Sequence, residues 1–250
     1  MNPDRERMLR EMGLGPVWKL RVSQAAVRCE HVATAPPVEH PPLPEATPGV
    51  VPVSGVASVA PPATTAWDEL AAAVVACRAC RLCEARKQAV LGVGDLNADW
   101  LFVGEGPGAE EDARGEPFVG QAGKLLDNML AAIGLKRGAD VYIANAVKCR
   151  PPENRTPTPE ETATCRPYLE RQIELIRPKL IVALGRPAAQ TLLQTEIKIA
   201  AARGKLHDYR GIPLIVTYHP AYLLRTLLDK AKAWEDLCFM RRAMREQKDR

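Results

Sequence analysis

Four apolar runs, each long enough for a buried strand, most constrain how this chain can fold. They are WLFVGEG at 100–106, VYIANAV at 141–147, LIVALG at 180–185 and PLIVTYHP at 213–220. A strand that is apolar throughout, rather than at alternate positions, is buried on both of its faces. Helical patterns lie between the runs, at 121–133, 159–176 and 186–193. We therefore expect an α/β fold: a three-layer α/β/α sandwich with a four-stranded parallel sheet.

The first two helical patterns have specific support. The segment 121–133 places its large apolar residues on one face of a helix: Leu125, Leu126, Met129, Leu130 and Ile133. The segment 159–176 follows Thr158, a residue type that caps helix amino ends, and it begins with Pro159, which suits a first turn.

A proline-rich stretch precedes the segment that holds these runs. Nine prolines lie between positions 33 and 65, among alanine, valine, threonine and serine. Such a composition predicts an extended, semi-rigid linker. We expect an N-terminal tail at 1–30, a Pro/Ala-rich linker at 31–65 and one domain at 66–250, which is an ordinary domain size.

Composition limits the cellular compartment and the cysteine chemistry that we expect for this chain. No run approaches the roughly 20 apolar residues that span a bilayer, and the first ten residues lack the apolar core of a secretory signal. We expect a cytoplasmic protein without a membrane contact. Seven cysteines are then unlikely to pair as disulfides, and a clustered subset is expected to bind metal. The net charge of +4 is compatible with a polyanionic partner but does not demonstrate one.

Polar residues follow the predicted strands at the edge where ligands bind in open parallel sheets. The first run leads into Gly-Glu-Gly-Pro-Gly at 104–108, the second contains Asn145, and the fourth ends at His219. Taken singly, the glycine loop is more often a tight turn, Asn145 a turn residue and His219 a structural histidine. The loop also matches neither nucleotide-binding glycine pattern. Their common location at three strand ends favours a functional site.

Cysteines are concentrated in one short stretch, with Cys77, Cys80 and Cys83 at intervals of three. They could line a buried helix face, since free cysteine is among the most buried residue types. Zinc and an iron–sulfur cluster are the alternatives, and each requires four ligands. Cys149 and Cys165 are the remaining candidates. Zinc ribbons usually supply a second close pair, whereas these two are far apart, so the spacing leans towards iron–sulfur without deciding it.

Several motifs together resemble one known family. VGEGPGAEEDARGEPFVGQAGKLLDNML, NAVKCRPPENRTPTPEE and HPAYLLR, in that order behind a C-x-x-C pair, are similar to the family 4 uracil-DNA glycosylases. The resemblance covers about Cys77 to Met240. It implies the α/β/α fold and a 4Fe-4S cluster, whose ligands would be Cys77, Cys80, Cys149 and Cys165. Cys83 has no counterpart in that pattern.

The resemblance also implies roles in binding uracil. Phe118 would stack on a flipped uracil, Asn145 would bond its O4 and N3–H, and His219 would contact its O2. A backbone amide of Gly106 would line the pocket. These roles agree with the chemistry, because a glycosylase extrudes its base from the duplex and stabilises negative charge on the departing uracil.

A catalytic carboxylate is also expected, to orient water or to stabilise the positive sugar. Glu105 is the first candidate. Glu111 is the second and could also block the methyl group of thymine. For DNA contacts we expect Lys148, Arg150 and Arg155 near phosphates, and a minor-groove loop that contains Tyr222, Leu223, Leu224 and Arg225.

The N-terminal segment RERMLREMGLGPVWKLR resembles the amino end of the DNA polymerase III psi subunit. The resemblance implies that residues 1–21 bind the chi subunit, whereas the alternative is a poorly ordered tail.

From these observations we expect a base-excision repair enzyme that acts on uracil-containing DNA, either single- or double-stranded, and leaves an abasic site. Two alternatives remain open at this point. One is a non-catalytic iron–sulfur module that binds damaged DNA, and the other is a zinc-bound nucleotide hydrolase.

Overall fold

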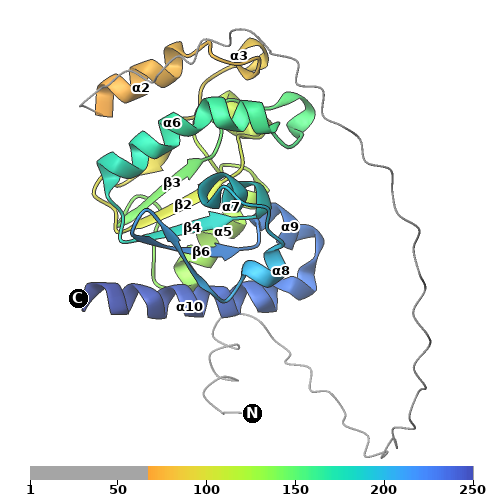
Figure 1. Ribbon diagram of the computed structural model, residues 1–250. Helices are drawn as coiled ribbons and strands as arrows, with labels where there is room; N and C mark the ends of the chain where they lie inside the picture. Colours follow the sequence, from red (N-terminus) through yellow and green to blue (C-terminus); the bar gives the residue numbers. More distant parts are fainter. Residues whose placement is uncertain (1–66, 250) are drawn as a thin grey trace, which may run out of the picture. The chain divides into compact units, whose positions relative to one another are not determined.

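Six strands form one sheet in the part of the chain that the structure, a computed structural model, describes: residues 67–249 (Figure 1). Their order across the sheet is β1-β3-β2-β4-β6-β5. The strands are β1 (Val93–Gly94), β2 (Trp100–Gly104), β3 (Val141–Asn145), β4 (Leu180–Leu184), β5 (Leu206–Tyr209) and β6 (Ile212–Thr217). The four central strands are parallel, as predicted.

The two edge strands, β1 and β5, are antiparallel to their neighbours and were not predicted. β1 has two residues, and β5 is largely exposed, so neither gives an apolar run. β5 and β6 are joined by a two-residue turn in which Arg210 and Gly211 both have positive φ, 51° and 87°. Two consecutive left-handed residues are the geometry of tight hairpin turns, and this turn makes β5 a neighbour of β6.

Helices connect the strands at the predicted positions. α5 (Gln121–Ala132), α6 (Pro159–Ile176) and α7 (Arg186–Leu193) match the three helical patterns of the sequence. Thr158 caps α6: its hydroxyl accepts from the amide of Glu161, and the Glu161 carboxylate accepts from the amide of Thr158. The other helices are α2 (Trp67–Ala76), α3 (Leu82–Ala85), α4 (Ala109–Arg114), α8 (Ile199–Ala202), α9 (Pro220–Arg225) and α10 (Lys230–Lys248), with 3-10 turns η1 (Pro152–Asn154) and η2 (Leu227–Asp229).

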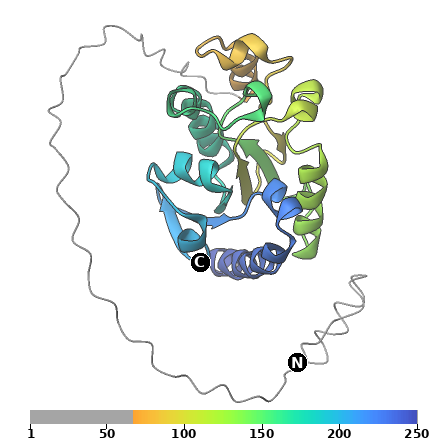
Figure 2. The same ribbon diagram turned by 90° about the vertical axis from the view of Figure 1, so that its right-hand side faces the viewer.

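The sheet is covered on both faces, as the apolar strands require. Phe102 and Ile143 pack against α5 and α10 on one side, and their neighbours Leu101 and Tyr142 pack with residues of α6 and α7 on the other. Figures 1 and 2 show α6 and α10 on opposite sides of the sheet. This arrangement confirms the three-layer sandwich and leaves the ends of the strands accessible.

A buried ion pair attaches α10 to the sheet. Asp236, only 1% exposed, accepts from the guanidinium of Arg203 at 2.8 Å and from the hydroxyl of Thr217 at 2.6 Å. The guanidinium of Arg203 also lies over the ring of Tyr218, 5.0 Å from its centroid. Tyr218 in turn stacks on Tyr222 of α9. The network therefore links α10, the end of β6 and the helix that follows it.

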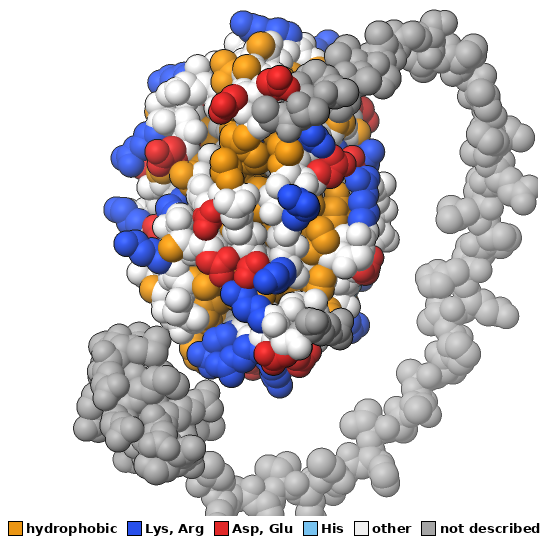
Figure 3. Space-filling view, turned by 90° about the vertical axis from the view of Figure 1, so that its left-hand side faces the viewer, with side chains coloured by type: hydrophobic (Ala, Val, Ile, Leu, Met, Phe, Trp, Pro, Cys, Tyr) orange, Lys and Arg blue, Asp and Glu red, His pale blue; other side chains and the backbone are white. Residues whose placement is uncertain are grey.

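The face shown in Figure 3 has acidic and basic side chains interspersed, rather than a patch of one sign. Near the start of β2, Asp99 accepts from Lys179 at 3.2 Å and from Lys248 at 2.8 Å. These two lysines hold the pKa of Asp99 below its usual value, although burial acts in the opposite direction. The pairs tie the last turn of α10 to the amino ends of two strands.

Within residues 67–249 no helix is both long and apolar enough to cross a membrane. The predicted tail at 1–30, the linker at 31–65 and the proposed chi-binding segment at 1–21 lie outside the described residues.

The ion pair of α10 leads to a stability prediction. Arg203→Met leaves the buried carboxylate of Asp236 without its cation, so we expect a loss of roughly 3 kcal/mol or more in the free energy of unfolding. Arg210→Met is the matched control, because Arg210 forms an exposed pair with Glu170 and its loss should cost less than about 1 kcal/mol. Urea unfolding of both variants checks this. Equal losses would contradict the assignment.

Candidate active site

The candidate site begins where β2 and β3 end side by side. Gly104, the last residue of β2, is paired with Asn145, the last residue of β3. A Cβ on Gly104 would lie 2.5 Å from the Asn145 Oδ1 atom and 2.6 Å from the ring of Phe118. Only glycine fits at this point. The amide and the aromatic ring therefore converge on the same strand end.

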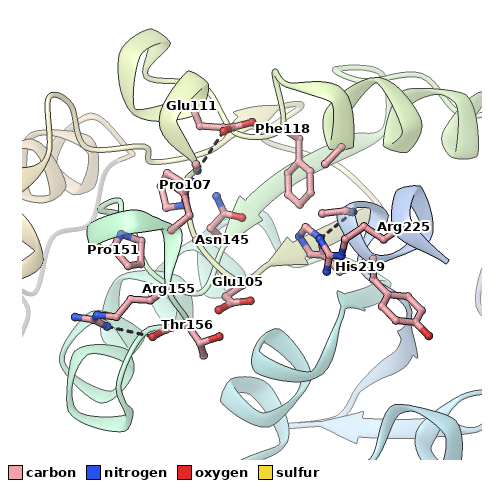
Figure 4. Close-up of a pocket in the computed structure, with 16 residues that line it drawn as sticks. Glu105, Pro107, Glu111, Phe118, Asn145, Pro151, Arg155, Thr156, His219 and Arg225 are labelled. Atoms are coloured by element: carbon pink, nitrogen blue, oxygen red, sulfur yellow. Dashed lines mark hydrogen bonds between the residues drawn. The ribbon is translucent and has the colours of Figure 1, made fainter.

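A pocket of about 520 Å³ opens at this edge of the sheet. It gathers residues from three stretches that are far apart in the sequence, 105–122, 145–156 and 219–225 (Figure 4). The predicted site residues that line it are Glu105, Gly106, Glu111, Phe118, Asn145, Tyr222, His219 and Arg225. The pocket thus brings together residues that the sequence placed at strand ends, and Phe118, which the family resemblance named.

Asn145 is 2% exposed, and its Oδ1 atom is buried without a hydrogen-bond partner among the described residues. A buried acceptor without a partner costs free energy, whereas a ligand with a suitable donor removes that cost. In Figure 4 the amide is seen between Pro107 and Phe118, with Glu105 below it. The unpartnered oxygen is an acceptor that a hydrogen-bond donor could satisfy.

Phe118 forms an aromatic wall of the pocket. Its φ is 55°, in the left-handed region that bulky residues avoid. Its ring lies 5.5 Å from the ring of His219, tilted by 31°. Strained backbone of this kind persists only where the surrounding structure holds it, and it is common at functional sites.

His219 is held as a neutral imidazole. Its Nδ1 atom accepts a hydrogen bond from the amide of Ala221 at 3.1 Å, so the ring proton must lie on Nε2. Burial and, to a smaller extent, the charge of Arg225 lower the pKa of His219 to about 4, against an opposing effect of Glu111. The side chain therefore offers a neutral N–H donor near the pocket.

The two candidate carboxylates have different partners. The carboxylate of Glu111 accepts hydrogen bonds from three backbone amides, those of Gly108 at 3.1 Å, Val119 at 3.0 Å and Gly120 at 3.1 Å. Its oxygens are largely used to hold the loop that carries Phe118. Glu105 is half-buried at the pocket wall. Burial raises the pKa of Glu105, while the hydroxyl of Thr156 and the charge of Arg186 lower it.

Two predicted DNA contacts are corrected by the structure. Lys148 is 1% exposed, and its ammonium donates to the carbonyl of Asn145 and to the side chain of Gln172. It lies inside the protein, and burial lowers its pKa to about 8. Leu223 is also 1% exposed and packs in the core. Neither side chain is available to touch DNA.

The other predicted contact residues lie at the surface near the pocket. Leu224 is 41% exposed on α9, and Arg225 follows it at the pocket rim. Arg150 is half-buried, with its guanidinium bonded to Asn154. Tyr222 donates its hydroxyl to Asp229 at 2.6 Å, so that group is already engaged within the protein.

Sequence reasoning missed Asn154 and Thr156 as pocket residues, and placed Arg155 only near phosphates. All three belong to the loop after β3, which the sequence analysis treated mainly as a connection to the cysteines. Arg155 forms a two-point pair with Glu161, with both distances 2.7 Å. The position of this loop directly after a parallel strand was the signal that could have identified it.

A second, small cavity brings the cysteines together. Five of its lining residues are Cys77, Cys80, Cys83, Cys149 and Cys165. Hydrogen bonds reach several of the sulfurs. The guanidinium of Arg86 donates to the Cys149 sulfur at 2.9 Å, and the backbone N–H of Lys148 donates to the Cys165 sulfur at 3.2 Å. Arg86 also donates to the carbonyls of Val75 and Cys77. Among the described residues, no group of three or more possible ligands meets the criteria for a single metal ion.

Comparison with known proteins gives the family. The profile of the uracil DNA glycosylase superfamily matches residues 91–238. The type-4 uracil-DNA glycosylase of Archaeoglobus fulgidus is 49% identical over 165 residues, which are 63% of this chain and 82% of that protein. The chain belongs to the type-4 uracil-DNA glycosylases. The enzyme of the same name from Thermotoga maritima is 50% identical over 60% of this chain and 78% of its own length.

A more distant branch of the same superfamily is also similar. The type-5 uracil-DNA glycosylase of Pyrobaculum aerophilum is 36% identical over 52% of this chain and 64% of its own length. The type-4 enzyme of that organism is 43% identical over 64% of this chain. The chain is thus more similar to the type-4 enzyme of this organism than to its type-5 enzyme, which agrees with the type-4 assignment.

The geometry of His219 predicts its titration. Because burial lowers its pKa to about 4, we expect its imidazole to stay neutral from about pH 8 down to about pH 5, whereas an ordinary histidine protonates near pH 6.5. Nitrogen-15 NMR of histidine-labelled protein checks this, and His219→Gln identifies the signal. A proton on Nδ1, or a midpoint near the ordinary value, would contradict the assignment.

Proposed function

We propose that this chain excises uracil from DNA by hydrolysing the N-glycosidic bond, and so leaves an abasic site. The observation that carries the proposal is the buried amide of Asn145, whose Oδ1 atom has no partner within residues 67–249 and lines one pocket with Phe118 and His219. Membership of the type-4 uracil-DNA glycosylases supports the same substrate. The alternative of a non-catalytic binding module is not favoured.

Recognition in this proposal depends on the pattern of donors and acceptors on the base. The Oδ1 atom of Asn145 accepts from uracil N3–H, and its Nδ2 group donates to O4. In this orientation of the amide, cytosine, with an acceptor at N3 and a donor at N4, would leave both atoms unsatisfied. Phe118 stacks on the flipped base, and this contact offsets part of the free energy that unstacking costs.

His219 and Glu105 each stabilise one of the two charges that develop as the bond breaks: the negative charge on uracil and the positive charge on the sugar. The N–H at Nε2 of His219 donates to uracil O2, where negative charge develops as the glycosidic bond breaks. A neutral donor stabilises this charge without having to transfer its proton. Glu105 orients the attacking water and stabilises the positive sugar. Glu111 is the weaker candidate, because three backbone amides already occupy its carboxylate. Its role against the thymine methyl stays a prediction.

Exposed leucines supply the contact with the duplex. Leu224, Leu227 and Leu228 are 41%, 63% and 89% exposed, and they follow one another across α9 and η2. We propose that this group replaces Leu223 as the apolar wedge that enters the stack when uracil leaves it. Arg150 and Arg225 are the basic side chains that would contact phosphates.

The cysteine cavity suits an iron–sulfur cluster held by Cys77, Cys80, Cys149 and Cys165. The observation that supports the fit is the pair of N–H donors on two of the sulfurs, from Arg86 and Lys148, since such bonds surround thiolate ligands in cluster sites. When bound, the cluster would supply a cross-link rather than a reacting group. Cys77 and Cys80 lie between α2 and α3, so they would tie this segment to the loop after β3.

The remaining predictions concern the setting of the protein. We propose action on DNA in the cytoplasm. An association of residues 1–21 with the polymerase III chi subunit stays a prediction, because those residues lie outside the described part of the chain.

Cleavage of an oligonucleotide with a single deoxyuridine tests the proposed function. We expect strand breaks at uracil after alkali, and none at thymine. Asn145→Ala should lower kcat/KM by about 100-fold or more, since it removes both bonds to the base. Asn97→Ala, at an exposed position outside the pocket, is the control and should retain full activity. An unmodified chain that leaves uracil intact would overturn the proposal.

The cluster predicts a difference between two cysteine variants. Cys165→Ser removes a proposed ligand, so anaerobically purified protein should lose its brown colour and most of its iron, which is about four atoms per chain in the unmodified protein. Cys238→Ser, on α10 outside the cysteine cavity, should retain both. Iron and zinc analysis checks this. Zinc in place of iron would support the hydrolase alternative, and equal iron in both variants would contradict the ligand set.

A further inference from the structure

The strained turn that carries Phe118 is held from a residue outside the pocket. Arg137 follows α5 and is not among the residues that line the cavity. Its guanidinium donates to two consecutive carbonyls, to Pro117 at 2.9 Å and to Phe118 at 2.8 Å. The same group pairs with Asp127 of α5 at 2.9 Å. One planar side chain thus connects the turn to the helix.

The opposite edge of the same turn has a second support. Glu111 accepts from the amides of Val119 and Gly120, directly after Phe118. The carbonyls of Pro117 and Phe118 and the amides of the next two residues are therefore bonded to side chains from different segments. Since a left-handed phenylalanine is not self-stabilising, these external bonds are what keep it in place.

The turn also has little space in which to relax. Gly123 on α5 lies so close that a Cβ there would be 1.8 Å from the carbonyl oxygen of Phe118. The carbonyl is therefore confined between the helix backbone and the guanidinium. Loss of the Arg137 bond would free this carbonyl, which belongs to the same residue as the phenyl ring. The Phe118 side chain is 6% exposed.

We propose that Arg137, fixed by Asp127, is a positioning residue that sets the Phe118 ring for stacking on the flipped base. This inference rests on the proposed function and deepens it, because it assigns base recognition partly to a residue that does not touch the base. Lysine cannot replace arginine here, since one ammonium does not present the two parallel N–H groups that reach adjacent carbonyls.

A double-mutant cycle between Arg137→Gln and Phe118→Ala tests the assignment, with kcat/KM on single-deoxyuridine DNA as the readout. In the unmodified background we expect Arg137→Gln to lower kcat/KM by about 10- to 100-fold, as misplacement of a positioning group does. Arg137→Lys should not restore it. In the Phe118→Ala background the same substitution should change kcat/KM less than about twofold, because the ring that it positions is already absent.

Controls separate the inference from the proposed function and from misfolding. Arg210→Gln removes another arginine with an acidic partner, remote from the turn, and should leave kcat/KM unchanged. Asp127→Asn weakens the hold on Arg137 from the helix side. It should lower kcat/KM less than Arg137→Gln does, with the same dependence on Phe118. This variant also tests the inference if Arg137→Gln does not fold. Equal losses with and without Phe118, or no loss at all, would overturn the inference. Absence of cleavage by the unmodified chain would instead overturn the proposed function.

Discussion

The pairing of Gly104 with Asn145, at the ends of two adjacent parallel strands, is the constraint on which the rest of the site depends. Parallel strands release their loops at the same edge, so the glycine loop and the asparagine emerge together. The missing side chain of Gly104 leaves the space that the amide of Asn145 and the ring of Phe118 fill. A larger residue there would separate the two groups that are proposed to recognise the base.

The loops at this edge of the sheet are not held by backbone hydrogen bonds between strands. Side chains supply the hydrogen bonds that hold them. Glu111 binds the amides that flank the Phe118 turn, Arg137 binds its carbonyls, and the Thr156 hydroxyl bonds to Glu105. Such supporting contacts determine how accurately a site is held, because a flexible loop loses geometry that catalysis requires. Glu111 illustrates this: three backbone amides donate to its oxygens, so Glu105 is the carboxylate that we propose orients water.

The pocket and the cysteine cavity share one short segment of chain, 145–149. Lys148 lies between them: its ammonium donates to the Asn145 carbonyl at 2.8 Å, and its backbone N–H donates to the Cys165 sulfur at 3.2 Å. Gln172 accepts from the ammonium and donates to Leu91 and Tyr142. This buried polar network explains why a lysine is tolerated inside the protein, and it makes the end of β3 a rigid support for both centres.

The sequence by itself determined the four parallel strands, the main helices and the common location of Glu105, Asn145 and His219. The apolar patterns, the helix cap and the residues that follow each strand can all be read from neighbours along the chain. Only the tertiary structure decided which side chains face outward. Leu223 and Leu224 are adjacent and identical, yet helical rotation buries one and exposes the other. The burial of Lys148, the proton position on His219 and the hold of Arg137 on Phe118 were likewise decided by contacts that no local pattern encodes.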